Sequence, residues 1–108
     1  KYWEIGLLVL KLRQKTMRKT IKFQVSGKVQ GVFFRASTKQ QAGNLPLCGW
    51  VRNCRNGDVE GVASGEVAQI ESFAAWLKQG PAMASVQKLD VYESDYQHFE
   101  DFIVREDD

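Results

Sequence analysis

Apolar and polar residues alternate in two stretches of the chain, residues 20–26 (TIKFQVS) and residues 85–92 (SVQKLDVY). Side chains along a strand point to opposite faces in turn, so this alternation predicts strands with one buried face. Short apolar runs bounded by turn residues predict three further strands, over 47–54, 58–64 and 101–105. The pattern therefore indicates a protein that is rich in strands, the last of which is short.

Two other stretches have the spacing of an amphipathic helix. Residues 66–79 place apolar side chains three and four positions apart, and Gly80 and Pro81 follow as typical signals of a helix end. Residues 34–45 show a weaker repeat, which stops at Pro46 because proline cannot continue a helix. We therefore expect two helices, each of which follows a strand.

The pair Asn56-Gly57 lies between the predicted strands 47–54 and 58–64 and predicts a β-hairpin. We expect a type I′ turn, because Asn and Gly both tolerate the positive φ angles that its two central residues need. The complete order is then β-α-β-β-α-β with a short final strand. This order predicts an α+β protein with a ferredoxin-like, split βαβ sandwich, in which two helices cover one face of a mostly antiparallel sheet.

The length of 108 residues suits one domain with a modest core. The net charge of +2 is unevenly placed, because residues 1–16 hold four basic and one acidic residue while the remaining residues hold eleven and twelve. Residues 17–108 therefore lack the basic excess with which proteins neutralise nucleic-acid phosphates. We expect no nucleic-acid partner.

We predict one domain over residues 17–108 and an extension over residues 1–16 that does not belong to it. Their apolar run, residues 5–10, is far shorter than the roughly 20 residues that cross a bilayer, so we expect no membrane partner. The segment is an extension of uncertain origin: an expression tag, upstream translated sequence, an extra edge strand or a loose tail. An amphipathic segment on a membrane surface is a less favoured alternative.

Cys48 and Cys54 are the only cysteines, and both fall in the predicted strand 47–54. At about 3.3 Å per residue they stand roughly 20 Å apart, whereas a disulfide needs Cα atoms within about 7 Å. We therefore expect reduced thiols and a cytoplasmic location. Their spacing suits no metal site, and the single histidine, His98, falls in a polar turn, so we expect neither a metal nor a cofactor.

The stretch GKVQGVFFR, residues 27–35, joins the first predicted strand to the first predicted helix. Gly27 and Gly31 allow unusual backbone conformations, and the helix begins near Phe34, where the first N–H groups lack partners. Such N–H groups attract anions, and the Arg35 guanidinium matches phosphate oxygens. The stretch predicts a pocket for a small tetrahedral anion, although a structural turn with a surface arginine has the same pattern.

Three motifs together resemble the acylphosphatase family. The first, G-x-V-Q-G-V-x-F-R, is met in residues 27–35. The second, G-x-V-x-N followed by a tight turn and V-E, is met in residues 49–60, and the weaker W-L-x-x-G-P-x-x-A-x-V in residues 76–86. The resemblance covers about residues 18–105, and it implies a ferredoxin-like fold and metal-independent hydrolysis of an acyl phosphate to a carboxylate and inorganic phosphate.

The resemblance also assigns roles to residues of this chain. The family's catalytic arginine falls on Arg35, and its catalytic asparagine, which would orient the attacking water, falls on Asn53. A phosphoryl transition state needs mainly positioning and charge stabilisation, which an arginine and backbone N–H groups supply. The loop implied to bind the substrate phosphate comprises Lys28, Val29, Gln30, Gly31, Val32, Phe33 and Phe34. Inorganic phosphate would then be both the product and a competitive inhibitor.

Other interpretations share parts of this pattern. One is a non-catalytic anion-binding module, like the acylphosphatase-like domain of the much longer hydrogenase-maturation carbamoyl transferases. Another is an RNA-binding domain, which needs aromatic residues in its third strand, whereas residues 58–64 (DVEGVAS) have none. We favour a small monomeric enzyme. Cys54 stands where the family more often has a hydroxyl residue, and we expect it to tune the activity rather than abolish it.

Overall fold

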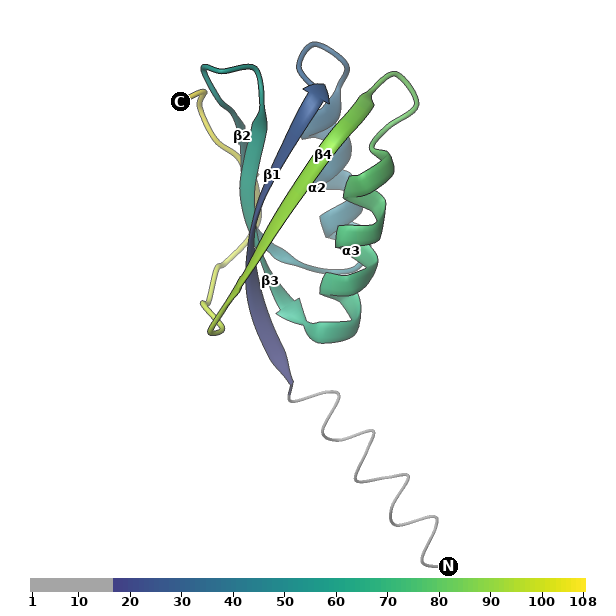
Figure 1. Ribbon diagram of the computed structural model, residues 1–108. Helices are drawn as coiled ribbons and strands as arrows, with labels where there is room; N and C mark the ends of the chain where they lie inside the picture. The colour runs from purple at the N-terminus through teal and green to yellow at the C-terminus, as the bar shows by residue number, and fades with distance from the viewer. Residues whose placement is uncertain (1–16) are drawn as a thin grey trace, which may run out of the picture.

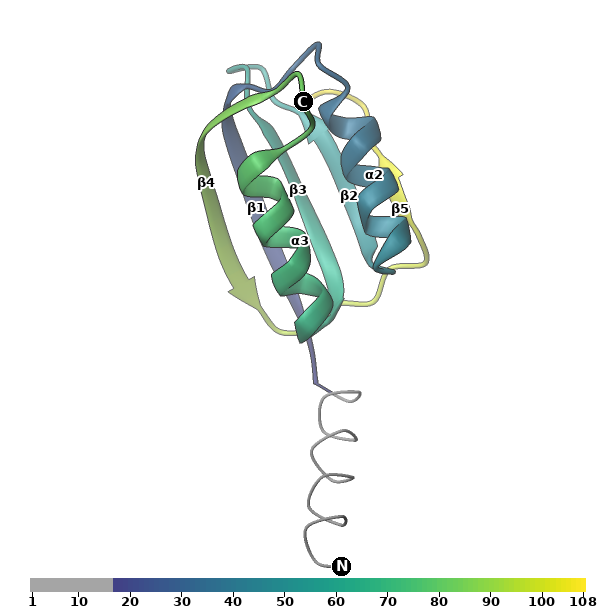
Figure 2. The ribbon, with the colours of Figure 1, turned by 90° about the vertical axis from the view of Figure 1, so that its right-hand side faces the viewer.

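The computed structural model describes residues 17–108, so the extension over 1–16, for which an extra edge strand is one of the alternatives, lies outside the described residues. The described part is a two-layer sandwich of one sheet and two helices (Figure 1), and Figure 2 shows both helices on the same face of the sheet. The strands are β1 (Arg18–Lys28), β2 (Cys48–Asn53), β3 (Val59–Glu66), β4 (Ser85–Ser94) and β5 (Phe102–Val104), and the helices are α2 (Phe34–Asn44) and α3 (Val67–Gln79). Neither of these helices is long and apolar enough to cross a membrane.

The strand order in the sheet is β4-β1-β3-β2-β5. β1 pairs antiparallel with both β3 and β4, β2 pairs antiparallel with β3, and β5 pairs parallel with β2. α2 joins β1 to β2 with β3 between them, and α3 joins β3 to β4 with β1 between them. This is the split βαβ topology, so the predicted fold class and the mostly antiparallel sheet are confirmed.

The core lies between the sheet and the two helices. Ile21, Phe23 and Val25, the alternating apolar residues of β1, are all buried. Phe23 meets Phe73 of α3 edge to face, with their ring centroids 5.5 Å apart. Full burial of such a side chain is worth roughly 1.5–3 kcal/mol. β1 is therefore held firmly in the middle of the sheet, and the loop that follows it starts from a fixed point.

All the predicted elements occur. The largest difference is in the length of β1, and the other strands differ from the predicted ranges by one or two residues at their ends. β1 runs two residues beyond the predicted stretch 20–26 at each end, and β4 runs two residues beyond 92. A change of register between Ser26 and Gly27 lets β1 continue its pairing with β4. Backbone pairing does not need apolar alternation to continue, and the sequence pattern therefore underestimates these strands.

The predicted hairpin between β2 and β3 is present, but the predicted type I′ turn is wrong. In this turn only Gly57 has a positive φ, at 97°. The Gly57 N–H donates to the Cys54 carbonyl oxygen at 3.1 Å, and the Cys54 N–H donates to the Asp58 carbonyl oxygen at 2.8 Å, which makes a three-residue loop. Asn56 Oδ1 accepts a hydrogen bond from the Asp58 N–H at 3.0 Å. Asn56 thus shapes the turn through its side chain rather than through a left-handed backbone.

The cysteines lie at opposite ends of the same strand. Cys48 begins β2, and Cys54 follows its last residue. Both are free thiols, which confirms the prediction that they do not bridge.

We expect Gly49→Ala to lower the free energy of unfolding by about 2–3 kcal/mol. Gly49 has a φ of +144°, and a Cβ atom there would overlap the carbonyl oxygen of Val62 in the paired strand β3. The variant must relieve both the backbone strain and the overlap. Urea denaturation monitored by circular dichroism measures the change.

Gly43→Ala in α2 is the matched control, because no atom lies within 4 Å of the position of its Cβ. We expect this variant to be unchanged or up to about 1 kcal/mol more stable. Equal losses in the two variants would contradict the close approach assigned to Gly49.

Candidate active site

Buried side chains fix the loop between β1 and α2. Val29, Val32 and Phe34 all lie in the hydrophobic core. Between them, Gly31 (φ 72°) and Phe33 (φ 62°) adopt left-handed backbone conformations, which turn the chain sharply towards α2. The three anchors hold the backbone of the loop in one conformation, which is the first requirement for a site built from main-chain groups.

The N–H groups of residues 29–36 have no hydrogen-bond partner within residues 17–108. No side chain caps the N-terminus of α2, and its first backbone hydrogen bond runs from the Ser37 N–H to the Phe33 carbonyl oxygen, at 3.0 Å. Unpaired N–H groups at a helix N-terminus carry partial positive charge and bind anions. The loop and the first turn of α2 therefore present a run of donors suited to phosphate oxygens.

The Gln30 side chain fastens this loop to the β2–β3 hairpin. Its Nε2 donates to the carbonyl oxygens of Cys54 and Asp58, both at 2.8 Å. Since Cys54 directly follows Asn53, the two hydrogen bonds set the position of Asn53 relative to the loop. Gln30 is therefore a positioning residue whose side chain points at the hairpin.

Asn53 is the last residue of β2 and is buried. Its main chain is held on both sides, because it pairs with Val59 in β3 and its carbonyl oxygen accepts a hydrogen bond from the Asp108 N–H at 2.9 Å. Its side-chain amide lines a cavity and makes no hydrogen bond to any described residue. A free amide on a fixed backbone is well suited to orienting a small molecule such as water.

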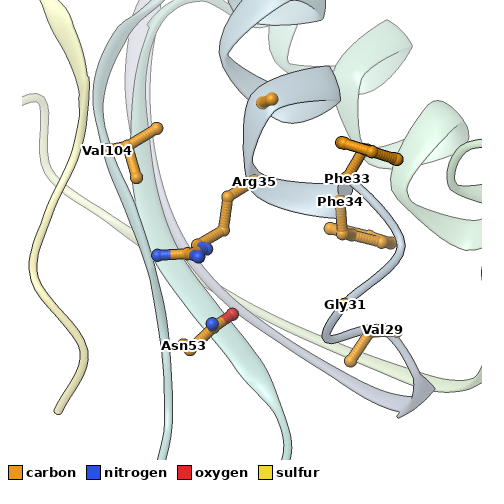
Figure 3. A pocket seen from close by; sticks show the side chains of 8 residues that line it. Val29, Gly31, Phe33, Phe34, Arg35, Asn53 and Val104 are labelled. Carbon is orange, nitrogen blue, oxygen red and sulfur yellow. The ribbon is translucent and has the colours of Figure 1, made fainter.

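Arg35 lies in the first turn of α2, and its guanidinium extends towards the same space as the amide of Asn53 (Figure 3). Its Nη1 lies 3.0 Å from Asp107 Oδ1, and both side chains of this ion pair are partly exposed. An exposed pair of this kind is worth at most about 1 kcal/mol. A bound phosphoryl group can therefore replace Asp107 on the guanidinium.

The Arg35 and Asn53 side chains and part of the loop line one cavity of about 360 Å³. Its walls are formed by Val29, Gly31, Phe33, Phe34, Arg35, Ala36, Asn53 and Val104. The structure thus brings Arg35 and Asn53 together with four residues of the predicted phosphate-binding loop. The other three do not line it. Lys28 is the last residue of β1, the Gln30 side chain is hydrogen-bonded to the hairpin, and Val32 packs in the core.

Three residues at the site are absent from the sequence motifs, namely Ala36, Val104 and Asp107. Val104 and Asp107 lie at the site because β5 pairs parallel with β2. This pairing continues beyond β5, where the Arg105 N–H donates to the Val51 carbonyl oxygen at 2.9 Å. The acidic end of the chain, residues 106–108, is the signal that could have suggested a partner for Arg35.

Burial and nearby charged groups keep the Cys54 thiol, next to Asn53, protonated. Arg52 Nη2 lies 2.8 Å from Glu60 Oε2. Burial raises the pKa of Glu60, but the hydrogen bonds from Arg52 and Cys54 and the positive charges of Arg52 and Lys22 together outweigh burial and hold that pKa below its ordinary value. Burial, with a smaller effect from the Glu60 carboxylate, raises the pKa of the Cys54 thiol to about 12. The thiolate is the reactive form of cysteine, so Cys54 is not a nucleophile at neutral pH.

A sequence model of the acylphosphatase family matches residues 21–104, a range that contains the loop, Arg35 and Asn53. The chain belongs to the acylphosphatase family. Its activity is accordingly the hydrolysis of an acyl phosphate to a carboxylate and inorganic phosphate.

Individual acylphosphatases agree with the family match. The acylphosphatase of Acaryochloris marina is 48% identical over 82 residues, which cover 76% of this chain and 88% of that protein. The structure of an acylphosphatase from Coxiella burnetii has 43% identity and a TM-score of 0.81, over 86% of this chain and 98% of that one. Full-length HypF, in a phosphate- and nucleotide-bound form, has 26% identity and a TM-score of 0.77 over 85% of this chain, but only 12% of HypF is covered. This chain therefore corresponds to nearly the whole of a small acylphosphatase and to a minor part of HypF.

We expect Asp107→Asn to tighten the binding of inorganic phosphate by roughly two- to fivefold at low ionic strength. The Asp107 carboxylate competes with phosphate for Arg35 and repels its negative charge. The inhibition constant of phosphate against acyl phosphate hydrolysis measures the effect, and about 0.5 M salt should reduce it through screening. Asp95→Asn, which removes an exposed carboxylate outside the site, is the control. Weaker phosphate binding by Asp107→Asn would show instead that Asp107 holds Arg35 in place.

We expect the wild type to lose stability relative to Cys54→Ser as the pH rises above about 9. The folded thiol has its pKa raised from 9.0 to about 12, so its contribution is complete below the unfolded value and declines between the two values. Urea denaturation of both proteins at several pH values between 8 and 11 measures the difference. Cys48→Ser, at the partly exposed start of β2, is the control, and an equal alkaline effect there would contradict the assignment to Cys54.

Proposed function

We propose that the N–H groups of residues 29–36 and the Arg35 guanidinium hold the phosphoryl group, and that Asn53 orients the attacking water. The observation that carries this proposal is that Arg35, Asn53 and several residues of the loop line one cavity, although they come from three elements, the loop, α2 and β2. With the phosphoryl group bound at the loop, these donors would lie where its negative charge develops, and the buried side chains of Val29, Val32 and Phe34 fix the loop before the substrate binds. Preorganised donors of this kind stabilise a transition state without further rearrangement.

The reaction proceeds by displacement at phosphorus. The Asn53 side-chain oxygen accepts a hydrogen bond from a water molecule that lies in line with the bond to the acyl oxygen. The water oxygen forms a bond to phosphorus as the bond between phosphorus and the acyl oxygen breaks, and the electron pair leaves with the carboxylate. The proton of the water passes to a phosphoryl oxygen, which gives inorganic phosphate.

The chemistry of the cavity wall supports proton transfer to the substrate itself. Among the described residues that form the wall there is no carboxylate, histidine or thiol, and its one ionisable side chain is Arg35. The leaving carboxylate is stable as an anion and needs no protein acid. Nor do three His, Cys, Asp or Glu side chains of residues 17–108 come together as a metal site requires, which supports a metal-independent reaction.

We further propose that residues 17–108 form the acylphosphatase-like domain, with residues 1–16 as an extension of uncertain origin, and that the enzyme works as a monomer in the cytoplasm. The cavity is complete within one chain, and the family match begins at residue 21. Two free thiols suit a reducing compartment. The charge balance of residues 17–108 supports a small-molecule substrate rather than nucleic acid.

We expect Asn53→Ala to lower kcat for an acyl phosphate by about 10²–10³ with little change in KM, because one preorganised group is lost. We expect Arg35→Ala to lower kcat at least as much and to raise KM as well, because the guanidinium holds the phosphoryl group in both ground and transition states. Hydrolysis of benzoyl phosphate, followed by ultraviolet absorbance with EDTA present, measures both variants.

Asn44→Ala, at the exposed end of α2, is the matched control and should keep full activity. Circular dichroism should show the wild-type fold for every variant. Full activity of Asn53→Ala would remove its proposed role, and loss of wild-type activity in EDTA would overturn the metal-independent reaction. A folded wild type that binds phosphate without hydrolysing benzoyl phosphate would instead be an anion-binding module.

A further inference from the structure

Two exposed apolar side chains border the cavity where the proposed reaction takes place. Phe33 is 75% exposed and Val104 is 41% exposed, and both belong to the wall that contains Arg35 and Asn53. They come from different elements, the loop after β1 and the short strand β5. Single exposed apolar residues are common on protein surfaces, but two of them on the wall of one catalytic cavity form an apolar rim.

The conformation of Phe33 sets it apart from a residue that serves only the fold. It is the one residue other than glycine with a positive φ in residues 17–108, at 62°. Glycine or asparagine adopts this conformation more easily than a bulky aromatic residue. Since the Phe33 side chain is mostly exposed, burial in the core does not explain why phenylalanine is used. Outliers of this kind gather at functional sites.

The cavity has room and chemistry for the acyl end of the substrate. Its volume of about 360 Å³ lies at the lower end of the range of about 300–1,000 Å³ for ligand pockets, so it holds more than a phosphoryl group. The only polar side chains on its wall are Arg35 and Asn53, which the phosphoryl group and the water occupy. Outside the wall, the Asp107 carboxylate lies against Arg35 and disfavours acyl groups with a second negative charge.

We propose that Phe33 and Val104 bind the acyl group and make the enzyme select acyl phosphates with aromatic or branched aliphatic acyl groups over acetyl phosphate. This inference rests on the proposed placement of the phosphoryl group against the loop and Arg35. With the phosphoryl end held there, the acyl oxygen points away from the N–H groups and the attached carbon chain reaches the apolar rim. The contact removes apolar surface from water, and this contribution grows with the size of the acyl group.

The test compares kcat/KM for benzoyl phosphate and acetyl phosphate in each variant. We expect Phe33→Ala to reduce the ratio of benzoyl to acetyl by roughly three- to tenfold, mainly through the KM for benzoyl phosphate, and Val104→Ala to reduce it by less. Because the ratio of each variant is compared with the ratio of the wild type, the different intrinsic reactivities of the two substrates cancel.

Ile103→Ala is the matched control for Val104. Ile103 is a neighbouring residue of β5 with 49% exposure, but it pairs with Trp50 and faces the opposite side of the sheet. Its ratio should equal that of the wild type. Phe33→Gly relieves the left-handed conformation as well as removing the ring, so a ratio that falls in Phe33→Ala and in Phe33→Gly alike assigns the effect to the lost ring.

Equal losses for both substrates in the Phe33 variants, or a ratio that does not change, would overturn the inference. These outcomes differ from a failure of the proposed function, which would appear as acetyl phosphate hydrolysis that survives in Arg35→Ala and Asn53→Ala. The same fall in the ratio in Ile103→Ala would also count against an apolar rim at the cavity.

Discussion

The two hydrogen bonds from the Gln30 side chain to the β2–β3 hairpin are the constraint on which the site depends. The N–H donors and Arg35 belong to the segment that runs from β1 into α2, whereas Asn53 belongs to the hairpin. A glutamine amide has two N–H donors and can bridge two carbonyl oxygens, which a glutamate of the same shape cannot do. Because both acceptors are main-chain atoms, the bridge does not depend on the side chains at Cys54 and Asp58. This explains how the hairpin accommodates a cysteine directly after Asn53.

The site has a rigid interior, and at its border the positive charge of Arg35 lies beside the negative charge of Asp107. Buried valine and phenylalanine side chains fix the loop, and the strand pairing of β2 fixes the backbone of Asn53. The C-terminal segment, which β5 aligns with β2, brings acidic groups close to the one arginine of the cavity. In the proposed mode of binding, the oxygens of an entering acyl phosphate replace the Asp107 carboxylate on Arg35. The N–H groups of residues 29–36 have no such competitor among the described residues.

Local signals in the sequence predicted the helices and strands of this fold. Most of the site residues that these signals did not predict are placed by the pairing of strands far apart in the sequence. The alternation in β1 and the helical spacing in α3 are properties of neighbouring residues, and both elements formed where they were expected. Arg35 and Asn53 were assigned by resemblance, and their lining of one cavity agrees with that assignment without testing it. Val104 and Asp107 could not be found in this way, because their positions depend on β5 lying beside β2. Gln30 belongs to the predicted loop, but the motif does not say that its side chain turns towards the hairpin.

The central position of β1 has a consequence for how a new chain acquires its structure. β1 is made first, but its two neighbours, β3 and β4, begin only at residues 59 and 85. At synthesis rates of about 5–20 residues per second, β1 waits on the order of 3–15 s for its second neighbour. Until then at least one edge of β1 is open to other chains, which is the situation in which strands aggregate. The loop after β1 takes its final shape only when the last third of the chain is in place, so a partly made chain has no anion site.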